Sequence, residues 1–247
     1  MRPFLVVQLS DPHIGADWGG GDPVAMLAAA VACARDVVPK PDAVLVSGDL
    51  ADHAADSEYE QVHELLAPLG APLYVVPGNH DDALALRRHF GAPGAQYAAE
   101  LGPLRLVVLD STRPGADPGE LPADRLAWLD ETLAAAPGTP TLLALHHQPL
   151  GTGIPVFDAA GLPTADRRAL GKVVEAHPQV RRIVAGHTHR TMSGELGGRS
   201  VLAVPSVYVQ SRLEFGTEEI HVSHEPSGFA VHAWVDGELV SHVQPVR

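Results

Sequence analysis

Short apolar runs that alternate with amphipathic segments constrain the fold of this chain more than any other feature. The runs at residues 4–9, 43–47 and 73–76 are rich in β-branched residues and have the length of strands buried on both faces. Helices are expected between them, at residues 22–38 and 57–69. This strand–helix–strand order predicts parallel pairing through right-handed crossovers, and therefore an α/β fold.

The second half of the chain continues this pattern and then changes it. Further strands are expected at residues 96–100, 104–110, 141–145 and 181–185, and further helices at residues 123–136 and 164–176. Alternating polar and apolar residues then favour antiparallel strands at about residues 199–245. We find no repeat, low-complexity tract or linker in the sequence, so a single domain over residues 1–247 is expected, with two facing sheets and helices outside.

The composition limits the class of partner. Of the 247 residues, 45% are hydrophobic and 19% are charged, which is typical of a globular protein with a sizeable core. The net charge of −13 repels phosphate backbones, so nucleic acid is not expected as a partner. No apolar run approaches the length of a membrane span, and residues 4–9 are too short for a signal peptide. We therefore expect a cytoplasmic protein that does not contact a membrane.

Polar residues follow five of the expected buried strands directly. These segments are Ser10-Asp11-Pro12-His13, Gly48-Asp49, Gly78-Asn79-His80-Asp81, His146-His147 and Gly186-His187-Thr188-His189. Each one alone is also compatible with a turn or an exposed loop. Their repeated placement favours a site, because the carboxyl ends of parallel strands meet at one edge of a sheet, where ligands bind.

The side chains in these segments are those of a metal site. Imidazole, carboxylate and amide oxygen suit Mn, Fe, Zn, Co or Ni rather than an ion that prefers thiolate. The candidate ligands are Asp11, His13, Asp49, Asn79, His146, His187 and His189. This set is too large for one tetrahedral ion and suits two ions that share a carboxylate. Two metals about 3.5–4 Å apart commonly hold a bridging hydroxide and the phosphoryl oxygens in phosphoryl displacement.

The ordered series DPH, GD, GNHD, H and GHTH, spread over residues 5–190, resembles the calcineurin-like metallophosphoesterase superfamily. This resemblance implies an αββα sandwich of two mixed β-sheets flanked by helices. It implies two ions, Fe, Mn or Zn, bridged by hydroxide. It also implies two ligand sets joined by a bridging Asp49, with Asp11, His13 and His189 on one ion and Asn79, His146 and His187 on the other.

The resemblance also implies roles for two residues beside the ligands. His80 would contact the scissile phosphate and protonate the leaving group, and Asp81 would orient the ring of His80. A purely phosphate-binding His80 is the alternative. Either His146 or His147 can be the ligand, and we favour His146 because it is the first polar residue after the strand.

The stretches "LVVQLSDPHI", "LHHQP" and "VLAVPSVYVQ" resemble class III cyclic nucleotide phosphodiesterases and their glycerophosphodiesterase relatives. Those relatives often have a second proline where this chain has Gln148. The expected function is hydrolysis of small soluble phosphodiesters, first of all 3',5'-cyclic nucleotides, by attack of a metal-bound hydroxide. The alternatives are a glycerophosphodiesterase or broad phosphomono- and phosphodiesterase, and, more remotely, a non-catalytic metal-binding scaffold.

The loop at residues 148–163 is expected to form one wall of the substrate pocket. It follows a ligand-bearing strand directly, and its glycines at 151, 153 and 161 permit close approach of the backbone. A plain surface connection is the alternative. The expected partner is a small phosphodiester, and a homodimer is an open alternative for the assembly.

Overall fold

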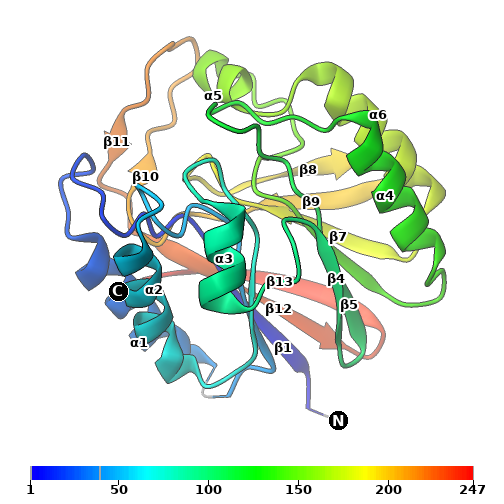
Figure 1. Cartoon of the computed structure of the whole chain (residues 1–247), viewed down its shortest axis with the longest axis horizontal. Coiled ribbons are helices and arrows are strands. Elements are labelled where there is room, and N and C mark those ends of the chain that lie inside the picture. Colours follow the sequence, from blue (N-terminus) through cyan, green and yellow to red (C-terminus); the bar gives the residue numbers. More distant parts are fainter. Residues whose placement is uncertain (1, 39, 247) are drawn as a thin grey trace.

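Two β-sheets lie face to face between layers of helices in the computed structural model, which describes residues 2–38 and 40–246 (Figure 1). The first sheet has the order β13 (Glu238–Pro245), β12 (Gly228–Val235), β1 (Phe4–Leu9), β2 (Ala43–Val46) and β3 (Leu73–Val75). The second has the order β4 (Tyr97–Leu101), β5 (Leu104–Val108), β6 (Thr141–Ala144), β7 (Val180–Ala185), β9 (Arg199–Ala203) and β8 (Met192–Leu196). The αββα arrangement of two mixed sheets is confirmed.

Helices cover the outer face of each sheet. The first sheet is covered by α1 (Pro23–Val37), α2 (Asp56–Leu66), a 3₁₀ turn at Ala67–Leu69 and α3 (Ala83–Phe90). The second is covered by α4 (Ala123–Ala134) and α6 (Thr164–Ala176), and the short α5 (Pro155–Ala160) lies near the strand ends. None of the helices within the described ranges is long and apolar enough to cross a membrane. The single domain over residues 1–247 stays a prediction.

The alternation of side chains along the strands explains why the two sheets pack together. In β5, Leu104, Leu106 and Val108 belong to the core between the sheets, whereas Val107 belongs to the core under α4 and α6. Successive strand residues point to opposite faces, so a strand that is apolar throughout is buried on both sides. The apolar runs that form β1, β2, β5, β6 and β7 are therefore central strands between two cores, whereas the run at 73–76 forms the partly buried edge strand β3.

The central strands of both sheets are parallel, and the antiparallel strands lie at the edges. β1, β2 and β3 pair in parallel, as do β5, β6, β7 and β9, whereas β12 pairs antiparallel with β1 and β13. The expected antiparallel pairing of the C-terminal strands holds for β9 only on the side of β8, and on its other side β9 pairs in parallel with β7. Its residues follow β8 in a hairpin, and this hairpin places β9 beside β7 in the parallel direction.

The strands β10 (Gln210–Ser211) and β11 (Val222–Ser223) form a separate two-stranded ribbon that does not pair with either sheet (Figure 1). Its connecting loop, residues 212–221, reaches toward α5 at the top of the view in Figure 1. The antiparallel ribbon lies within the region 199–245 where antiparallel strands were expected. In contrast, α3, α5 and β8 are absent from the sequence-based prediction, because each is short or lacks a clear apolar period.

The buried His232 of β12 links the edge strand β13 to β1, the strand that precedes Asp11 and His13. Its Nε2 donates to the Gln8 side-chain oxygen at 2.8 Å, and its Nδ1 accepts from the Ser241 hydroxyl at 2.6 Å. The Gln8 amide donates in turn to the Ser47 hydroxyl at 2.8 Å. Burial, together with the positive charge of Arg182, lowers the pKa of His232 to about 3, so the ring is neutral in the folded protein.

We expect His232→Gln to reduce the loss of stability on acidification. Below its ordinary pKa of 6.5, the unfolded chain binds a proton at His232 that the folded protein does not bind, so stability falls as the pH falls toward about 3. Glutamine cannot take up this proton. Between about pH 7.5 and about pH 5, the variant should lose roughly 2 kcal/mol less unfolding free energy than the wild type. Urea titrations at both pH values measure this, and equal losses would assign the effect to other groups.

Candidate functional site

The loops after the parallel strands meet at one end of the sandwich. The loop after β1 pairs with the loop after β2, since the His13 N–H donates to the Asp49 carbonyl at 2.9 Å. The loop after β7 joins both sheets, because the His187 N–H donates to the Asp11 carboxylate at 3.1 Å. The Gly186 N–H donates to the His146 carbonyl at 3.0 Å. The structure thus brings together the polar segments that the sequence places after separate strands.

The backbone of these loops is held in an unfavourable conformation. In the described part of the chain, seven residues other than glycine have a positive φ. Five of them are Asp11, His13, Asp49, His187 and His189, with φ between 44° and 70°. Such residues cost free energy and persist where surrounding contacts force them, which is common at functional sites. All five belong to the predicted ligand set.

The first cluster contains two imidazole nitrogens that face each other. His13 Nε2 lies 3.1 Å from His189 Nε2. The other nitrogen of each ring donates a hydrogen bond, from His13 Nδ1 to the Asp52 carboxylate at 2.9 Å and from His189 Nδ1 to the Val209 carbonyl at 3.0 Å. In the neutral rings both facing nitrogens therefore carry lone pairs. A positive charge, either a proton or a metal cation, has to lie between them.

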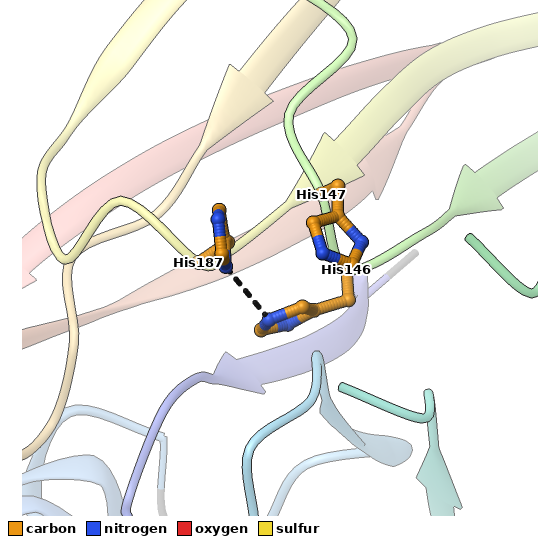
Figure 2. A group of neighbouring side chains, drawn as sticks. All are labelled: His146, His147 and His187. Atoms are coloured by element: carbon orange, nitrogen blue, oxygen red, sulfur yellow. Dashed lines mark hydrogen bonds between the residues drawn. The ribbon is translucent and has the colours of Figure 1, made fainter. Parts of the chain in front are cut away.

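The second cluster repeats this arrangement with different strands. His146 Nε2 lies 3.2 Å from His187 Nδ1 (Figure 2). It also lies 3.1 Å from the Asn79 side-chain oxygen. His146 Nδ1 donates to the Ser47 carbonyl at 2.8 Å, and His187 Nε2 donates to the Ala160 carbonyl at 3.0 Å. Three lone-pair atoms thus converge on one point, as ligands of a cation do.

Asp49 lies between the two clusters. Its Oδ2 is 3.3 Å from His146 Nε2 and 3.5 Å from His13 Nε2, and its Oδ1 accepts from the His80 N–H at 3.0 Å. Its side chain and those of its neighbours are almost completely buried. One carboxylate oxygen within reach of both clusters has the position of a bridging ligand between two ions.

The electrostatic potential of the site attracts positive charge. Burial opposes ionisation of Asp49, but the imidazoles of His146 and His13 outweigh it and hold the Asp49 pKa well below its usual range. Burial also opposes protonation of His146, yet the carboxylates of Asp49 and Asp11 raise its pKa to about 9. Burial and neighbouring imidazoles hold the pKa of His187 and of His189 well below the usual range. The donor groups fit metal ions in both charge and chemistry.

His147 lies beside the second cluster, but its nitrogens are engaged elsewhere (Figure 2). Its Nδ1 is 2.9 Å from the Ser111 hydroxyl, which also accepts from the His147 N–H, and its Nε2 donates to the Asp117 carbonyl at 2.9 Å. Burial and the charge of His146 lower the pKa of His147 to about 3. Its ring packs 4.5 Å from the His187 ring. The geometry therefore favours His146 over His147 as the ligand.

The prediction that Asp81 orients His80 is wrong. The Asp81 carboxylate accepts from the backbone N–H groups of Gly78, Leu50 and Ala51, and these bonds tie the loop after β3 to the loop after β2. The group beside the His80 ring is Asp52, whose carbonyl accepts from Nδ1 at 2.9 Å and whose carboxylate lies 3.6 Å away.

Asp52 is a site residue that sequence reasoning missed. Its carboxylate accepts from His13 and, at 3.1 Å, from the indole of Trp18. The signal in the sequence is its position three residues after Asp49, where the chain has left β2 and pairs with the loop that contains His13. Asp52 thus fixes the orientation of a candidate ligand and of His80 together.

A pocket of about 500 Å³ opens over the two clusters. Its floor includes His13, Asp49, Asn79, His187 and His189, and its walls include His80, Asp117 and the apolar side chains of Trp18, Phe157, Ile220 and Val222. Phe157 and Ala160 come from the 148–163 segment, so its expected place in a pocket wall is confirmed. Trp18, Asp117 and the residues of the β10–β11 ribbon were not expected.

Comparisons with known proteins agree with this geometry. Residues 4–191 match the sequence model of the calcineurin-like phosphoesterase family. A protein of Arcobacter nitrofigilis named "probable glycerophosphodiester phosphodiesterase GpdQ" is 30% identical, over 97% of this chain and 92% of its own length. A protein of Pseudomonas aeruginosa named "3',5'-cyclic adenosine monophosphate phosphodiesterase CpdA" is 34% identical, over 83% of this chain and 77% of its own. A dimetal phosphatase from Danio rerio has the same fold, with a TM-score of 0.72 at 17% identity over 100% of this chain and 98% of its own.

We expect Gly78→Ala to weaken metal binding. A Cβ on Gly78 would lie 2.1 Å from Asp49 Oδ1, so the variant displaces the carboxylate that lies between the clusters. The affinity of the metal-free protein for Mn²⁺ or Zn²⁺ should fall about 10–100-fold, as measured by isothermal titration calorimetry. Gly138→Ala is the matched control, because a Cβ there meets no atom within 4 Å. Wild-type affinity in Gly78→Ala would show that Asp49 does not need this space.

Proposed function

The chain belongs to the calcineurin-like phosphoesterase family, and on that premise we propose that it is a dinuclear metal-dependent phosphodiesterase for small phosphodiesters, with 3',5'-cyclic nucleotides as the first candidate substrates. One observation carries this proposal. Two groups of facing lone-pair atoms lie on either side of a buried carboxylate that reaches both, at the floor of a pocket. The names of two relatives, at 30% and 34% identity, support a phosphodiester as the substrate.

The proposed ligand sets follow the two clusters. Asp11, His13 and His189 hold one ion, Asn79, His146 and His187 hold the other, and Asp49 bridges them. We propose Fe, Mn or Zn with a shared hydroxide, because the donors are imidazole, carboxylate and amide groups without a thiolate. When bound, such a pair of ions supplies the nucleophile and neutralises charge on the phosphoryl group. The carbonyls of Ser47, Ala160 and Val209 and the carboxylate of Asp52 keep the imidazoles in the tautomers that binding requires.

His80 is the residue that we assign to the leaving group. Its ring lies in the pocket wall, 4.8 Å from the ring of His13, and about a third of its side chain is exposed. Because Nδ1 donates to the Asp52 carbonyl, Nε2 is the nitrogen that is left to face a substrate. The Asp52 carboxylate lies 3.6 Å from the same nitrogen. A protonated Nε2 can donate its proton to the departing alkoxide.

The lining of the pocket favours a diester over a monoester. None of the described residues that line it is lysine or arginine, and Asp117 adds a carboxylate to the wall. A phosphomonoester dianion would find no lysine or arginine there for its additional charge, whereas a diester carries a single charge. The apolar walls formed by Trp18, Phe157, Ile220 and Val222 suit a flat organic group such as a nucleobase better than glycerol. A glycerophosphodiester is the second candidate, on the name of the relative from Arcobacter nitrofigilis.

A substrate panel tests this function. Protein that carries about two equivalents of Mn²⁺ should hydrolyse 3',5'-cyclic AMP with a kcat/KM at least ~10-fold above that for 5'-AMP, with glycerophosphocholine between them. Product analysis and metal analysis of the same preparation measure both quantities. Faster turnover of glycerophosphocholine would favour the second candidate. Two bound ions without turnover of any diester would favour a non-catalytic scaffold.

We expect His80→Ala to lose turnover and keep its metals. General acid catalysis raises the rate about 10²–10⁴-fold when the leaving group is a poor one such as an alkoxide, and much less when it is a nitrophenolate. The loss in kcat should therefore be large with cyclic AMP and small with bis(p-nitrophenyl) phosphate. His242→Ala is the control, because His242 is exposed on β13 and is not among the residues that line the pocket. Equal losses of kcat with both substrates would show that His80 binds the phosphate but does not protonate the leaving group.

The cytoplasmic location, the absence of a nucleic acid partner and the homodimer stay predictions.

A further inference from the structure

The loop between β10 and β11 crosses from one wall of the pocket to the other. Ile220 and Val222 of this ribbon line the pocket on one side, and Phe157 of α5 lines it on another. At the far end of the loop, the Phe215 ring lies beside Gly153, since a Cβ on Gly153 would be 3.6 Å from Phe215 Cε1. Figure 1 shows the loop reaching the α5 segment. The two walls therefore meet on one side of the pocket.

The ribbon is held firmly at its base. Arg190, the residue after His189, donates to the Ser211 carbonyl at 2.7 Å and pairs through both terminal nitrogens with the Glu225 carboxylate at 3.1 and 3.3 Å. The Ser211 N–H donates to the His189 carbonyl at 3.0 Å. Across the ribbon, the Arg212 N–H donates to the carbonyl of residue 221 at 2.7 Å.

The opposite wall is equally well held. The Asp158 carboxylate accepts from the backbone N–H groups of Thr152 at 2.7 Å and Gly153 at 3.1 Å, so the loop before α5 is closed on itself. Arg167 donates to the Leu150 carbonyl at 2.9 Å and lies 3.7 Å from Asp158. Gly153 has a φ of +74°, which its lack of a Cβ allows, and this turn brings the backbone beside Phe215.

Both walls are also bonded to the candidate metal ligands. The ribbon side supplies the Val209 carbonyl to His189, and α5 supplies the Ala160 carbonyl to His187. Because these two histidines are separated by one residue, the spacing of the walls is tied to the spacing of the imidazoles. The pocket thus has a fixed width over the site.

Phe215 itself is poorly buried for an aromatic residue. The residue is 70% exposed, and its ring lies beside Gly153. An exposed phenylalanine contributes little to stability, and single exposed apolar residues are common. Because Phe215 lies where the two walls meet, its ring can limit the size of a bound substrate.

A pocket closed on one side differs from the groove that a chain-like substrate needs. Proteins that bind single-stranded nucleic acid use an open, positively charged groove along which the backbone continues. Ribbon and α5 residues line the pocket, and the ribbon residues Ile220 and Val222 are exposed to solvent, as is Trp18. Phe215 and Gly153 do not belong to this lining, and they join the ribbon to the α5 segment beyond it. A substituent that extends past the lining between the ribbon and α5 would meet the Phe215 ring.

We propose that Phe215 determines specificity for the alcohol group that stays esterified to phosphorus after hydrolysis. The Phe215 ring limits this group to about the size of one nucleoside. The proposal rests on the proposed phosphodiesterase function and adds to it the exclusion of chain-like diesters. Loss of the Phe215 ring opens the closed side without touching the metal ligands.

Two p-nitrophenyl esters with the same scissile bond test this proposal. One is thymidine 5'-(p-nitrophenyl phosphate), and the other carries the same p-nitrophenyl phosphate at the 5' end of a thymidine tetramer joined by neutral methylphosphonate linkages. The neutral linkages remove the repulsion between the acidic protein and a charged chain. The ratio of kcat/KM for the short and long esters then reports the size limit alone.

We expect the wild type to prefer the short ester by at least ~10-fold, and Phe215→Ala to reduce this preference at least ~5-fold because turnover of the long ester rises. Leu213→Ala is the matched control, since Leu213 lies in the same loop and is 51% exposed. Phe215→Leu should restore most of the preference. As a second measurement, the tetramer with a 5'-phosphate should inhibit Phe215→Ala more strongly than it inhibits the wild type.

The outcomes separate the size limit from the proposed function. Equal turnover of both esters by the wild type overturns the size limit and leaves the phosphodiesterase intact. An unchanged preference in Phe215→Ala, or the same change in Leu213→Ala, also overturns it. Failure of the metal-loaded wild type to hydrolyse the short ester overturns the phosphodiesterase function, and the size limit with it.

Discussion

Imidazole nitrogens that face each other with their lone pairs are the interaction around which this end of the molecule is built. His13 and His189 meet in this way on one side of Asp49, and His146 and His187 meet on the other. Such an arrangement is unfavourable without a positive charge between the rings, so folding alone does not favour it. In each ring, the nitrogen that does not face the other imidazole donates to a backbone carbonyl or to the Asp52 carboxylate. These hydrogen bonds hold the rings in this arrangement before any ligand binds. The positive φ angles at the same residues show that the backbone, too, is held against its local preference.

The αββα sandwich supplies this arrangement because its two sheets contribute parallel strands that end at the same place. The first sheet delivers Asp11, Asp49 and Asn79, and the second delivers His146 and His187. No single sheet carries a complete donor set, so the site exists only where the sheets face each other. The apolar side chains of β5, β6 and β7 that fill the space between the sheets therefore also determine the distance between the halves of the site.

The central strands and all seven candidate ligands could be anticipated from the sequence, because continuous apolar runs and the polar residues that follow them are local signals. The contacts of His80 could not. Asp81 is adjacent to His80 in sequence, but its carboxylate is directed to backbone N–H groups, whereas Asp52 arrives from another loop. The pocket walls escaped prediction for a related reason. Trp18 lies in a segment without periodicity, and the alternation around β10 and β11 indicates strands but not their place beside the pocket, so only tertiary packing positions these walls.

The carbonyls of Ala160 and Val209 have a consequence for how this pocket can change during evolution. Each belongs to a pocket wall and each holds a histidine at the floor. A mutation that shifts either wall to admit a different substrate also rotates an imidazole, so a change in selectivity would be accompanied by a loss of metal. Side-chain replacements on walls that stay in place avoid this coupling. New specificities in this lineage are therefore expected to arise from substitutions at exposed wall residues rather than from insertions in α5 or at the base of the ribbon.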